Sequence, residues 1–409
     1  MNARSTVLQL YTASFPYGKG ESVLENEILV LSKKFEKIYI HPKSSKAGDK
    51  RTVPDNVIVL DAINDRSNLN SFGIFFKNFG SILWILWSEF IHCNNKFYFI
   101  KKIRSFNSLL IRAFYDAACI KQLSGFSDKK HVHYSFWMND WALALSVLKY
   151  KKDINRFIFR CGRFDIYDER HEGNYLPFRF FIYKNTSAIY PNSLFGTNYI
   201  KKKQCFEDKV QLQYWGTNDY GLNPFASQGM FTIVSCSNLI PLKRVHLIIE
   251  ILKQLKFEFK WVHFGDGFLM NDLKEKAKSL PDSAHFEFRG SVSNQEILNF
   301  YKKNSVNLFI TTSETESLPV SIQEAISFGI PCVATNVGGI SEIVNDTTGK
   351  LIEKDFDIKA VAAIVDGFYS GNKNTPEYRK GVRQFWLDHF SAEVNYNAFY
   401  NEIVQRTRS

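Results

Sequence analysis

The chain has 409 residues, of which 45% are hydrophobic, 15% aromatic and 23% charged. At about 150 residues per domain this length predicts two or three domains, and the composition excludes a disordered chain, a collagen and a disulfide miniprotein. The net charge of +11 is uneven: residues 1–220 hold 32 Lys and Arg against 20 Asp and Glu, and residues 221–409 hold 20 against 21. The first half is therefore the one expected to meet an anionic surface.

The cysteines and the N-terminus bear on the cellular compartment. Six cysteines are scattered without any Cys-x-x-Cys pair, which predicts free thiols in a reducing compartment and argues against a disulfide frame or a zinc site. The first residues lack the pattern of a signal peptide, so the cytoplasm is the expected location. The most apolar window, residues 73–91, is interrupted by polar residues. We expect it to be too short to span a bilayer, which needs about 20 apolar residues.

The first half alternates strands and helices. Strands are predicted at residues 7–11, 37–41, 56–60, 131–136, 156–160, 187–192 and 210–214. Helices are predicted at residues 21–35, 70–92, 97–123, 141–149 and 177–184, and again between the last two strands. Residues 215–230 hold turn-forming residues without a period, and we interpret them as the linker between domains.

The second half repeats this alternation more regularly. Strands are predicted at residues 231–236, 259–265, 285–290, 306–312, 331–335 and 349–353, and helices at 245–255, 271–280, 294–303, 320–328 and 340–344. Such alternation predicts an α/β fold of two Rossmann-like, doubly wound parallel-sheet domains facing across a cleft. We place the domains at residues 1–220 and 221–384, with a helix at about 385–409 that packs back on the first domain.

Two acidic residues stand out in residues 311–342, which begin at the carboxyl end of a predicted buried strand, where ligands bind in open α/β sheets. Glu316 is expected in the loop after the strand, and Glu324 about two turns into the next helix. Pro319 suits the first turn of that helix. The alternative is that the two carboxylates are merely solvated, but the ordered setting favours a functional pair.

Backbone groups of the same window are suited to binding an anion. The N–H groups of Ser317, Leu318 and Val320 lie at the expected helix start, where the positive end of the helix favours a phosphate. A second such end is expected at Gly338 and Gly339, because glycine lets the backbone approach an anion closely. The window therefore predicts a phosphate-binding site.

This window closely resembles the nucleotide-sugar signature of the retaining family 4 glycosyltransferases, which have the GT-B fold. In that family a Glu-x7-Glu pair closes on the donor, and the resemblance implies that Glu316 meets the transferred sugar and Glu324 the ribose. The resemblance covers most of residues 231–352. It includes Gly265 and Gly267 of a Gly-Asp-Gly turn, and residues 285–303, a stretch often placed near the nucleobase.

A basic pair precedes this window. Lys243 and Arg244 lie between a predicted strand and helix, where they are expected to contact a diphosphate, the Lys as a point charge and the Arg as a fork. The alternative is an exposed pair that caps a loop. The family usually has Arg where this chain has Asn238. That departure weakens one expected phosphate contact on the donor side, which Arg244 is expected to replace.

The first domain supplies candidates for the acceptor side. Gly18 and Gly20 lie in the first strand–helix turn, where the family has its acceptor and diphosphate loop, and Glu21 is positioned to bind acceptor hydroxyls. The alternative is structural: glycines that form the turn, and an acidic residue that suits the helix dipole.

A second first-domain candidate is the segment of residues 159–170. Family members often carry Arg-x-His-x-x-Asp here, the His lying against the sugar. Arg160 and Asp165 match this pattern, whereas Gly162 stands where the His would be. The resemblance therefore implies an acceptor-side role for Arg160 and a catalytic role for Asp165, in a set that lacks the histidine.

The resemblance implies a hexosyltransferase-type enzyme that moves a sugar, with retention, from a nucleotide-diphosphate-sugar to a glycan or lipid-linked saccharide in surface polysaccharide biosynthesis, such as lipopolysaccharide or capsule. We expect the nucleotide-sugar as co-substrate, no further cofactor and no obligatory metal, because no Asp-x-Asp lies beside a donor loop. The alternative is a catalytically impaired GT-B partner or scaffold subunit. A nucleic-acid partner is not expected, because the basic patches come without a recognised motif.

The excess basic charge coincides with aromatic helices, in which Phe75, Phe76, Trp84 and Trp87 precede the Lys/Arg-rich residues 96–104. Apolar bulk beside a cationic cluster is typical of a helix that lies in the headgroup layer. We therefore expect an anionic membrane surface as a partner and a peripheral position on the inner face of the plasma membrane. The alternative is that these aromatic residues belong to the core.

Overall fold

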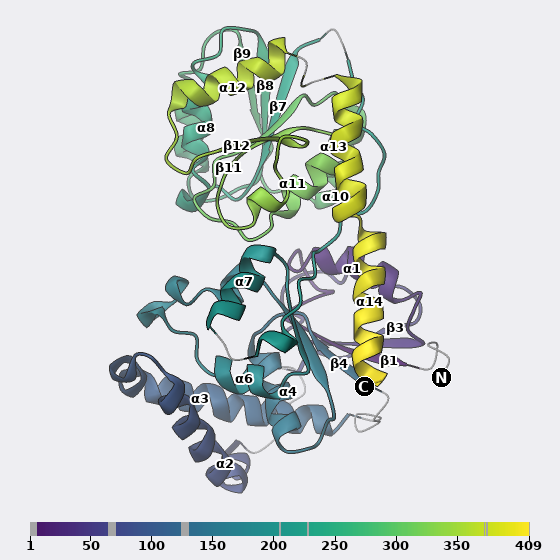
Figure 1. The fold of residues 1–409 in the computed structure, drawn as a ribbon, viewed down its shortest axis with the longest axis vertical. Helices are drawn as coiled ribbons and strands as arrows, with labels where there is room; N and C mark the ends of the chain where they lie inside the picture. The colour runs from purple at the N-terminus through teal and green to yellow at the C-terminus, as the bar shows by residue number, and fades with distance from the viewer. Residues whose placement is uncertain are drawn as a thin grey trace. The chain divides into compact units, whose positions relative to one another are not determined.

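The fold was determined as a computed structural model, which describes residues 6–63, 71–123, 131–203, 206–226, 229–371, 373 and 375–408. The chain divides into two compact units. Unit 1 comprises the residues up to Gln213 together with those from Tyr396 onward, and unit 2 comprises Tyr214–Asn395. Each unit is described separately below (Figure 1).

Unit 1 contains a six-stranded parallel sheet in the order β3-β2-β1-β4-β5-β6. Its strands are β1 (Val7–Thr12), β2 (Lys37–Pro42), β3 (Val57–Val59), β4 (His131–Ser135), β5 (Phe157–Cys161) and β6 (Ala188–Pro191). Its helices are α1 (Val23–Leu31), α2 (Ser71–His92), α3 (Lys96–Lys121), α4 (Asp140–Tyr150), α5 (Arg163–Ile166), α6 (Arg179–Asn185) and α7 (Leu194–Lys203), followed after unit 2 by α14 (Ala392–Arg408). The strand predicted at residues 210–214 is reduced to a single bridge of Val210 to Ile189.

Helices cover both faces of this sheet. Successive side chains of a strand point to opposite faces, so Tyr134 of β4 lies against Phe399 of α14 while His133 bonds to Tyr11 within the opposite layer. That opposite layer is a large apolar core to which α3, α4 and α6 contribute. Figure 1 shows α14, drawn in yellow, running alongside this sheet.

The α2 helix, Ser71–His92, matches the helix predicted at residues 70–92. By length and composition alone, one helix among the described residues could cross a membrane: Phe72–His92, with a mean hydropathy of 1.2. This length and composition alone do not establish a membrane span, and the expectation that the window does not span a bilayer is not contradicted. One side of α2 nevertheless belongs to the fold, because Ile82, Ile85 and Glu89 are buried in unit 1.

Unit 2 contains a second six-stranded parallel sheet, in the order β12-β11-β10-β7-β8-β9. Its strands are β7 (Phe231–Cys236), β8 (Phe259–Phe264), β9 (Ala284–Phe288), β10 (Leu308–Thr311), β11 (Cys332–Thr335) and β12 (Gly349–Ile352). Its helices are α8 (Val245–Leu252), α9 (Met270–Ala277), α10 (Asn294–Lys303), α11 (Val320–Ser327), α12 (Ile358–Ser370) and α13 (Pro376–His389). Residues 340–344, predicted as a helix, form only a 3₁₀ turn at Ile340–Glu342. The two parallel sheets confirm the predicted α/β fold class.

The expected linker is partly a structural segment of unit 2. Asn223 is buried and its side-chain amide donates to the carbonyls of Tyr301 and Asn304, the latter at 2.7 Å. Arg379 of α13 is buried beside it and donates to the Asn223 side-chain oxygen at 2.6 Å. The side chains of Asn223 and Arg379 thus bond to backbone carbonyls that lack a partner in a strand or helix. The composition of the segment does not predict these contacts.

The boundary between the units also differs from the expected one. Unit 1 ends at Gln213 rather than at residue 220, and it resumes at Tyr396 rather than at about 385. The reason is a helix break: α13 ends at His389 inside unit 2, and α14 begins at Ala392. Only the later part of the predicted C-terminal helix therefore packs on unit 1.

Candidate donor site in unit 2 and the unit 1 candidates

The strand order of unit 2 reverses between β7 and β10, and ligands in such sheets bind at the carboxyl ends of the strands on either side of the reversal. Lys243 follows β7 and Glu316 follows β10, and the Lys243 ammonium donates to Oε1 of Glu316. The two residues are 73 positions apart in sequence, yet the parallel sheet brings them together. A cation and an acid that were predicted separately therefore lie together at the switch point.

Hydrogen bonds between the two loops hold this pair in place. The N–H of Glu314 donates to the carbonyl of Leu242 at 2.8 Å, and Oγ1 of Thr312 donates to the carbonyl of Arg244 at 2.9 Å. Oγ1 of Thr335, at the end of β11, donates to the carbonyl of Ser313 at 2.6 Å. The loops after β7, β10 and β11 thus form one connected frame.

Arg244 is part of that frame, and its expected contact with a diphosphate stays a prediction. Its Nε donates to the carbonyl of Thr312 at 2.8 Å, and its Nη2 donates to the carbonyl of Lys354 at 2.8 Å. Arg244 also has a left-handed backbone, with φ of +47°. The guanidinium therefore ties two loops together, and Lys243 is the member of the basic pair that faces Glu316.

Glu324 lies on α11 with only 7% of its surface exposed. Its Oε1 accepts a hydrogen bond of 2.7 Å from the side-chain amide of Asn294, the first residue of α10. Burial raises the pKa of Glu324 to about 7, because desolvation penalises the charged form and the bond from Asn294 offsets only part of that penalty. A buried carboxyl with one amide partner is suited to receive further hydrogen bonds from hydroxyl groups.

Two predicted glycines are required by close backbone approaches. Gly338 has φ of +58°, and a Cβ on it would lie 1.9 Å from the carbonyl oxygen of Glu316. Gly265 has φ of +132°, and a Cβ would lie 1.9 Å from the carbonyl oxygen of Ser237. Larger side chains would push apart the loops that carry Glu316 and the end of β7. Gly267 follows in the same turn and also abuts backbone, at Leu239.

The start of α11 differs in detail from the prediction. Pro319 is the N-cap and Val320 the first helical residue, so the proline precedes the first turn. The side chain of Leu318 is buried in the apolar core, which leaves only its backbone for a ligand. The carbonyl of Ser317 accepts from the N–H of Gly339 at 2.8 Å, so the two predicted anion-binding ends are adjacent. Asn238 is exposed in the loop after β7.

The first candidates of unit 1 form a closed turn. Both oxygens of the Glu21 carboxylate accept backbone N–H groups, from Ala13 at 2.9 Å, Ser14 at 2.8 Å and Phe15 at 2.7 Å. Glu21 therefore folds its own loop, and its expected role of binding acceptor hydroxyls is not supported. Gly18 has φ of +70°, and Gly20 accepts through its carbonyl from Arg51.

Arg160 and Asp165 are both inside unit 1. Arg160 is fully buried, pairs with Glu27 at 3.4 Å and lies 4.0 Å from the ring centre of Phe399. This correction removes Arg160 from the acceptor side. Asp165 is 8% exposed and caps α5 by accepting from the N–H of Gly162 at 3.4 Å. Burial raises the pKa of Asp165 to about 6, partly offset by Arg179. In the structure Asp165 caps α5, and its catalytic role stays a prediction.

One donor-side residue was missed by the sequence reasoning. Asn294 holds Glu324, and its signal was present: Ser293 and Glu296 form a capping box that fixes the start of α10. The spatial link between α10 and α11 was not predictable from that pattern. Among the described residues, no group of three or more His, Cys, Asp and Glu side chains is arranged to hold a metal ion.

Comparison with known sequences supports a glycosyltransferase relationship for unit 2. Residues 224–385 match the sequence model of the family described as glycosyl transferases group 1. An uncharacterized glycosyltransferase of Methanocaldococcus jannaschii is 32% identical over 117 residues, which are 28% of this chain and 32% of that protein. A putative colanic acid biosynthesis glycosyltransferase of Escherichia coli is 24% identical over 217 residues, 50% of this chain and 53% of that protein. The chain spans about a third of the length of the first curated relatives it matches.

Solved structures with a similar fold extend over both units. A lipopolysaccharide outer core galactosyltransferase matches with a TM-score of 0.67 and 13% identity, covering 97% of this chain and 99% of that one. Anabaena HepE in complex with UDP matches with a TM-score of 0.65 and 14% identity, covering 98% and 100%. Unit 2 thus matches the glycosyl transferases group 1 model, and the chain has the fold of the GT-B glycosyltransferases, with two Rossmann-like parallel-sheet domains.

Proposed function

We propose that the protein is a retaining glycosyltransferase that transfers a sugar from a nucleotide-diphosphate-sugar to a saccharide acceptor. The observation that carries the proposal is the meeting of Lys243 with Glu316 at the switch point of unit 2, beside the buried Glu324. A cation, two carboxyl groups and a glycine-lined backbone are the groups needed for a phosphate, a sugar and a ribose. The UDP and UDP-glucose complexes of HepE support UDP-sugars as the first donors to test.

The proposed roles follow from the geometry of these groups. The Lys243 ammonium stabilises negative charge on the departing diphosphate as the glycosidic bond breaks. Glu316 orients the transferred sugar, and the Glu324 carboxylate accepts hydrogen bonds from the ribose hydroxyls. The departing phosphate takes the proton of the acceptor hydroxyl, so the reaction needs no protein nucleophile. We propose no obligatory metal ion, because the sequence has no Asp-x-Asp in a metal-binding position beside a donor loop.

The acceptor is proposed to be a glycan or lipid-linked saccharide of a surface polysaccharide. Support comes from the relative named for colanic acid biosynthesis and from the structural neighbour named for the lipopolysaccharide outer core. We further propose that unit 1 lies on the inner face of the plasma membrane while it acts. That position would give it access to a lipid-linked acceptor.

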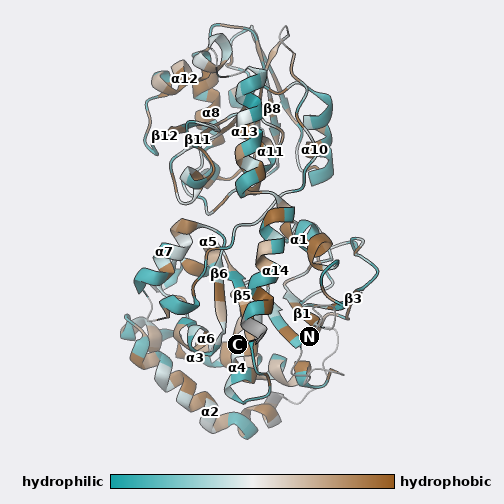
Figure 2. Cartoon of the chain, turned by 45° about the vertical axis from the view of Figure 1, so that its right-hand side comes forward, coloured by the Kyte–Doolittle hydropathy of each residue, from teal (hydrophilic) through white to brown (hydrophobic). Residues whose placement is uncertain are grey.

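The support for membrane association is an exposed apolar stripe on α2. Its members recur every three or four residues, the spacing of one helix face: Phe72, Phe76, Phe79, Leu83, Trp87 and Ile91. Figure 2 shows hydrophobic residues, in brown, recurring along α2. On α3, exposed Phe97 and Ile100 lie beside exposed Lys96, Lys101 and Arg104. Apolar side chains next to cations fit an anionic lipid surface.

Vesicle co-sedimentation tests this association. We expect binding to vesicles containing phosphatidylglycerol that exceeds binding to phosphatidylcholine alone and that weakens at high salt. Replacing Phe76 and Trp87 together by Ser should abolish it, whereas Phe268→Ser, which changes an exposed phenylalanine of unit 2, should not. Equal sedimentation of the variants and the wild type would leave a soluble acceptor as the better proposal.

Thermal unfolding and donor hydrolysis test the enzymatic proposal. A panel of UDP-, GDP- and ADP-sugars should contain a compound that raises the melting temperature, because ligands that bind only the folded state stabilise it by mass action. The same compound should be hydrolysed slowly by the wild type and not by Lys243→Ala. Stabilisation without hydrolysis or transfer would favour the alternative, a catalytically impaired partner subunit.

A further inference from the structure

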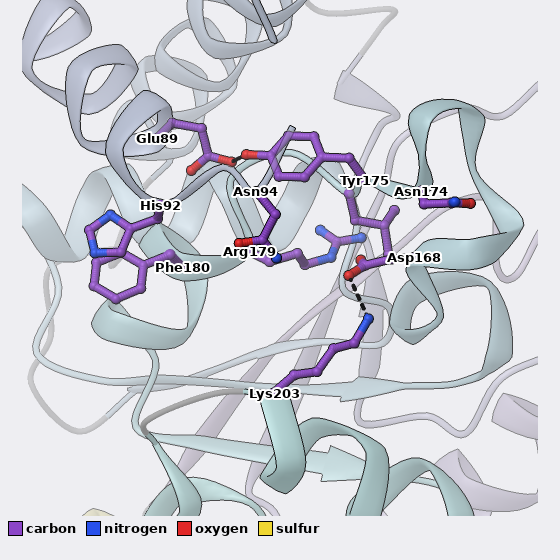
Figure 3. Close-up of a pocket in the computed structure, with 10 residues that line it drawn as sticks. Glu89, His92, Asn94, Asp168, Asn174, Tyr175, Arg179, Phe180 and Lys203 are labelled. Atoms are coloured by element: carbon purple, nitrogen blue, oxygen red, sulfur yellow. Dashed lines mark hydrogen bonds and ion pairs between the residues drawn. The ribbon is translucent and has the colours of Figure 1, made fainter. Parts of the chain in front are cut away.

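Unit 1 contains a polar cavity that the proposed donor chemistry does not use. Its volume is about 200 Å³, and it is lined by the last turn of α2, the 3₁₀ turns around residues 168–174, the first turn of α6 and the end of α7. Figure 3 shows the side chains that define its chemistry gathered around it: Glu89, His92, Asp168, Arg179, Phe180 and Lys203.

Glu89 is the most constrained of these groups. Only 3% of it is exposed, and its Oε1 accepts both from the hydroxyl of Tyr175 and from the N–H of Phe178. Its Oε2 makes no hydrogen bond to any described residue, although Glu89 lines the cavity. This oxygen can therefore accept a hydrogen bond from a ligand or from water in the cavity.

Arg179 provides the opposite kind of group. Its Nε donates to the carbonyl of Asp165 at 3.2 Å, and within the described part of the chain its two terminal nitrogens donate to nothing. It lies near enough to Glu89 to stabilise the charged carboxylate, although burial is the larger effect and raises the pKa of Glu89 to about 7. One acceptor, Oε2 of Glu89, and the N–H donors of the Arg179 terminal nitrogens therefore remain available to a ligand in the cavity.

The charges of the cavity exclude a simple ion as its ligand. Lys203 and Asp168 neutralise each other across 3.0 Å, which leaves one carboxylate and one guanidinium. An anion would be repelled by Glu89, and a cation by Arg179. A pair of neighbouring hydroxyl groups satisfies both residues, because each hydroxyl can donate to a carboxylate and accept from a guanidinium.

The apolar part of the wall agrees with such a ligand. The rings of His92 and Phe180 are stacked, with centroids 3.4 Å apart, and both line the cavity. A flat aromatic surface beside a few polar groups packs against the C–H groups of a sugar ring. We propose that this cavity binds one neutral monosaccharide unit, with Glu89 and Arg179 holding two of its hydroxyl groups.

Such a subsite would hold a saccharide unit of the acceptor, and this assignment rests on the proposed glycosyl transfer. The binding of a monosaccharide to the cavity does not depend on the proposed glycosyl transfer. Sugar binding to the cavity can be measured without any nucleotide, and nucleotide binding by unit 2 is measured separately. Failure of either proposal is therefore distinguishable from failure of the other.

Saturation-transfer NMR tests the cavity, with the methyl glycosides of glucose, galactose, mannose, rhamnose and N-acetylglucosamine as probes at millimolar concentration. We expect at least one to receive saturation from the wild-type full chain. Glu89→Gln keeps an oxygen for Tyr175 and Phe178 but turns a donor toward Arg179, so affinity should fall at least about tenfold. Arg179→Lys should cause a similar loss. Glu172→Gln is the matched control, because Glu172 is exposed and pairs with Lys102 outside the cavity.

Three outcomes would overturn the proposal. The first is the absence of saturation in every glycoside with the wild type. The second is a signal that persists in Glu89→Gln and Arg179→Lys but disappears in Glu316→Gln, because that signal would belong to unit 2. The third is tighter binding of methyl glucuronide than of methyl glucoside, because a preference for the anion contradicts the charge argument. If Glu89→Gln melts early, Arg179→Lys alone decides.

Discussion

At the scale of single residues, the two acids of the signature window have different environments. Glu316 has a lysine beside it, whereas Glu324 is buried with a neutral amide. The charged pair of Lys243 and Glu316 suits contact with the transferred sugar, whose charge changes during the reaction. A buried carboxyl with free hydrogen-bonding capacity suits the unchanging hydroxyls of a ribose. The sequence spacing predicted the pair but not this division.

Replacement of Glu324 by Gln tests its burial and its role together. The folded-state pKa of about 7 exceeds the ordinary 4.5, so the folded state holds a proton more firmly and loses stability as pH rises from about 4.5 to 7. Glu324→Gln removes that loss and should be more stable than wild type above pH 7, by up to about 3 kcal/mol. Urea unfolding at pH 5 and pH 8 measures the difference.

The same variant should bind nucleotide less tightly. Gln offers one acceptor oxygen where the carboxylate offers two, so we expect a loss of about 1–3 kcal/mol in affinity for the nucleoside diphosphate. Wild-type affinity should also fall as pH drops below about 7, because Glu324 becomes protonated, and Glu324→Gln should lack this pH dependence. Affinity equal to wild type, measured by calorimetry, would remove Glu324 from the ribose.

Lys243 is the residue whose loss should affect turnover most. If its ammonium neutralises charge on the leaving diphosphate, Lys243→Ala should lower kcat by about 100-fold or more, a loss of about 2.7 kcal/mol. Lys354→Ala is the control, since that lysine pairs with Glu314 at 3.1 Å on the neighbouring loop and is more exposed. Similar effects of the two substitutions would indicate a general effect of charge.

At the scale of elements, function depends on how the loops after parallel strands are tied together. Arg244, Thr312 and Thr335 connect three such loops by hydrogen bonds, and Gly338 lets the loop after β11 pass against Glu316. Each of these residues is polar or small. Such residue types indicate a loop in the sequence, but they do not indicate which other loop it contacts. The contacts of Arg244 with two carbonyls were not predictable for this reason, because a basic residue in a loop can bind either carbonyls or phosphates.

Gly338→Ala tests the tightest of these contacts. The new Cβ would lie 1.9 Å from the Glu316 carbonyl at a backbone φ of +58°, so the loop must move. We expect a destabilisation of about 1–3 kcal/mol and a large loss of turnover. Gly381→Ala, in α13, meets nothing within 4 Å and should instead stabilise the protein by about 1 kcal/mol. Thermal unfolding and activity assays compare the two.

The return of α14 to unit 1 depends on Phe399. This side chain is fully buried and contacts Arg160, Tyr134 and Tyr190. Phe399→Ala should therefore cost about 3–5 kcal/mol of the stability of unit 1. Val394→Ala changes an exposed residue of the same helix and should cost little. Denaturant unfolding monitored in unit 1 distinguishes them, and equal effects would contradict the packing of α14.

At the scale of the whole molecule, we propose different tasks for two units of the same architecture. Unit 2 carries the group 1 glycosyltransferase match and the proposed donor site, whereas unit 1 carries the excess positive charge, the apolar stripe of α2 and the polar cavity. Related glycosyltransferases are expected to share the nucleotide part of the donor and to differ in their acceptors. This contrast is consistent with a family match that covers residues 224–385, in the second half of the chain.

Nucleotide binding should therefore affect the two units unequally. UDP at 100 times its Kd should stabilise the folded state by about 2.7 kcal/mol. We expect hydrogen-exchange protection in the loops after β7, β10 and β11 of unit 2, because the predicted contacts lie there. Protection confined to unit 1 would contradict the placement of the donor site.

The sequence by itself determined the α/β class, the two parallel sheets and the Glu316–Glu324 window, because periodicity, strand ends and spacing are local properties of the chain. The tertiary structure alone decided which side chains are partners across the sheet. It joined Lys243 to Glu316 and Asn294 to Glu324, buried Arg160 beneath α14, and gave the carboxylate of Glu21 to its own loop. Those outcomes depend on contacts between distant segments, which no local pattern specifies.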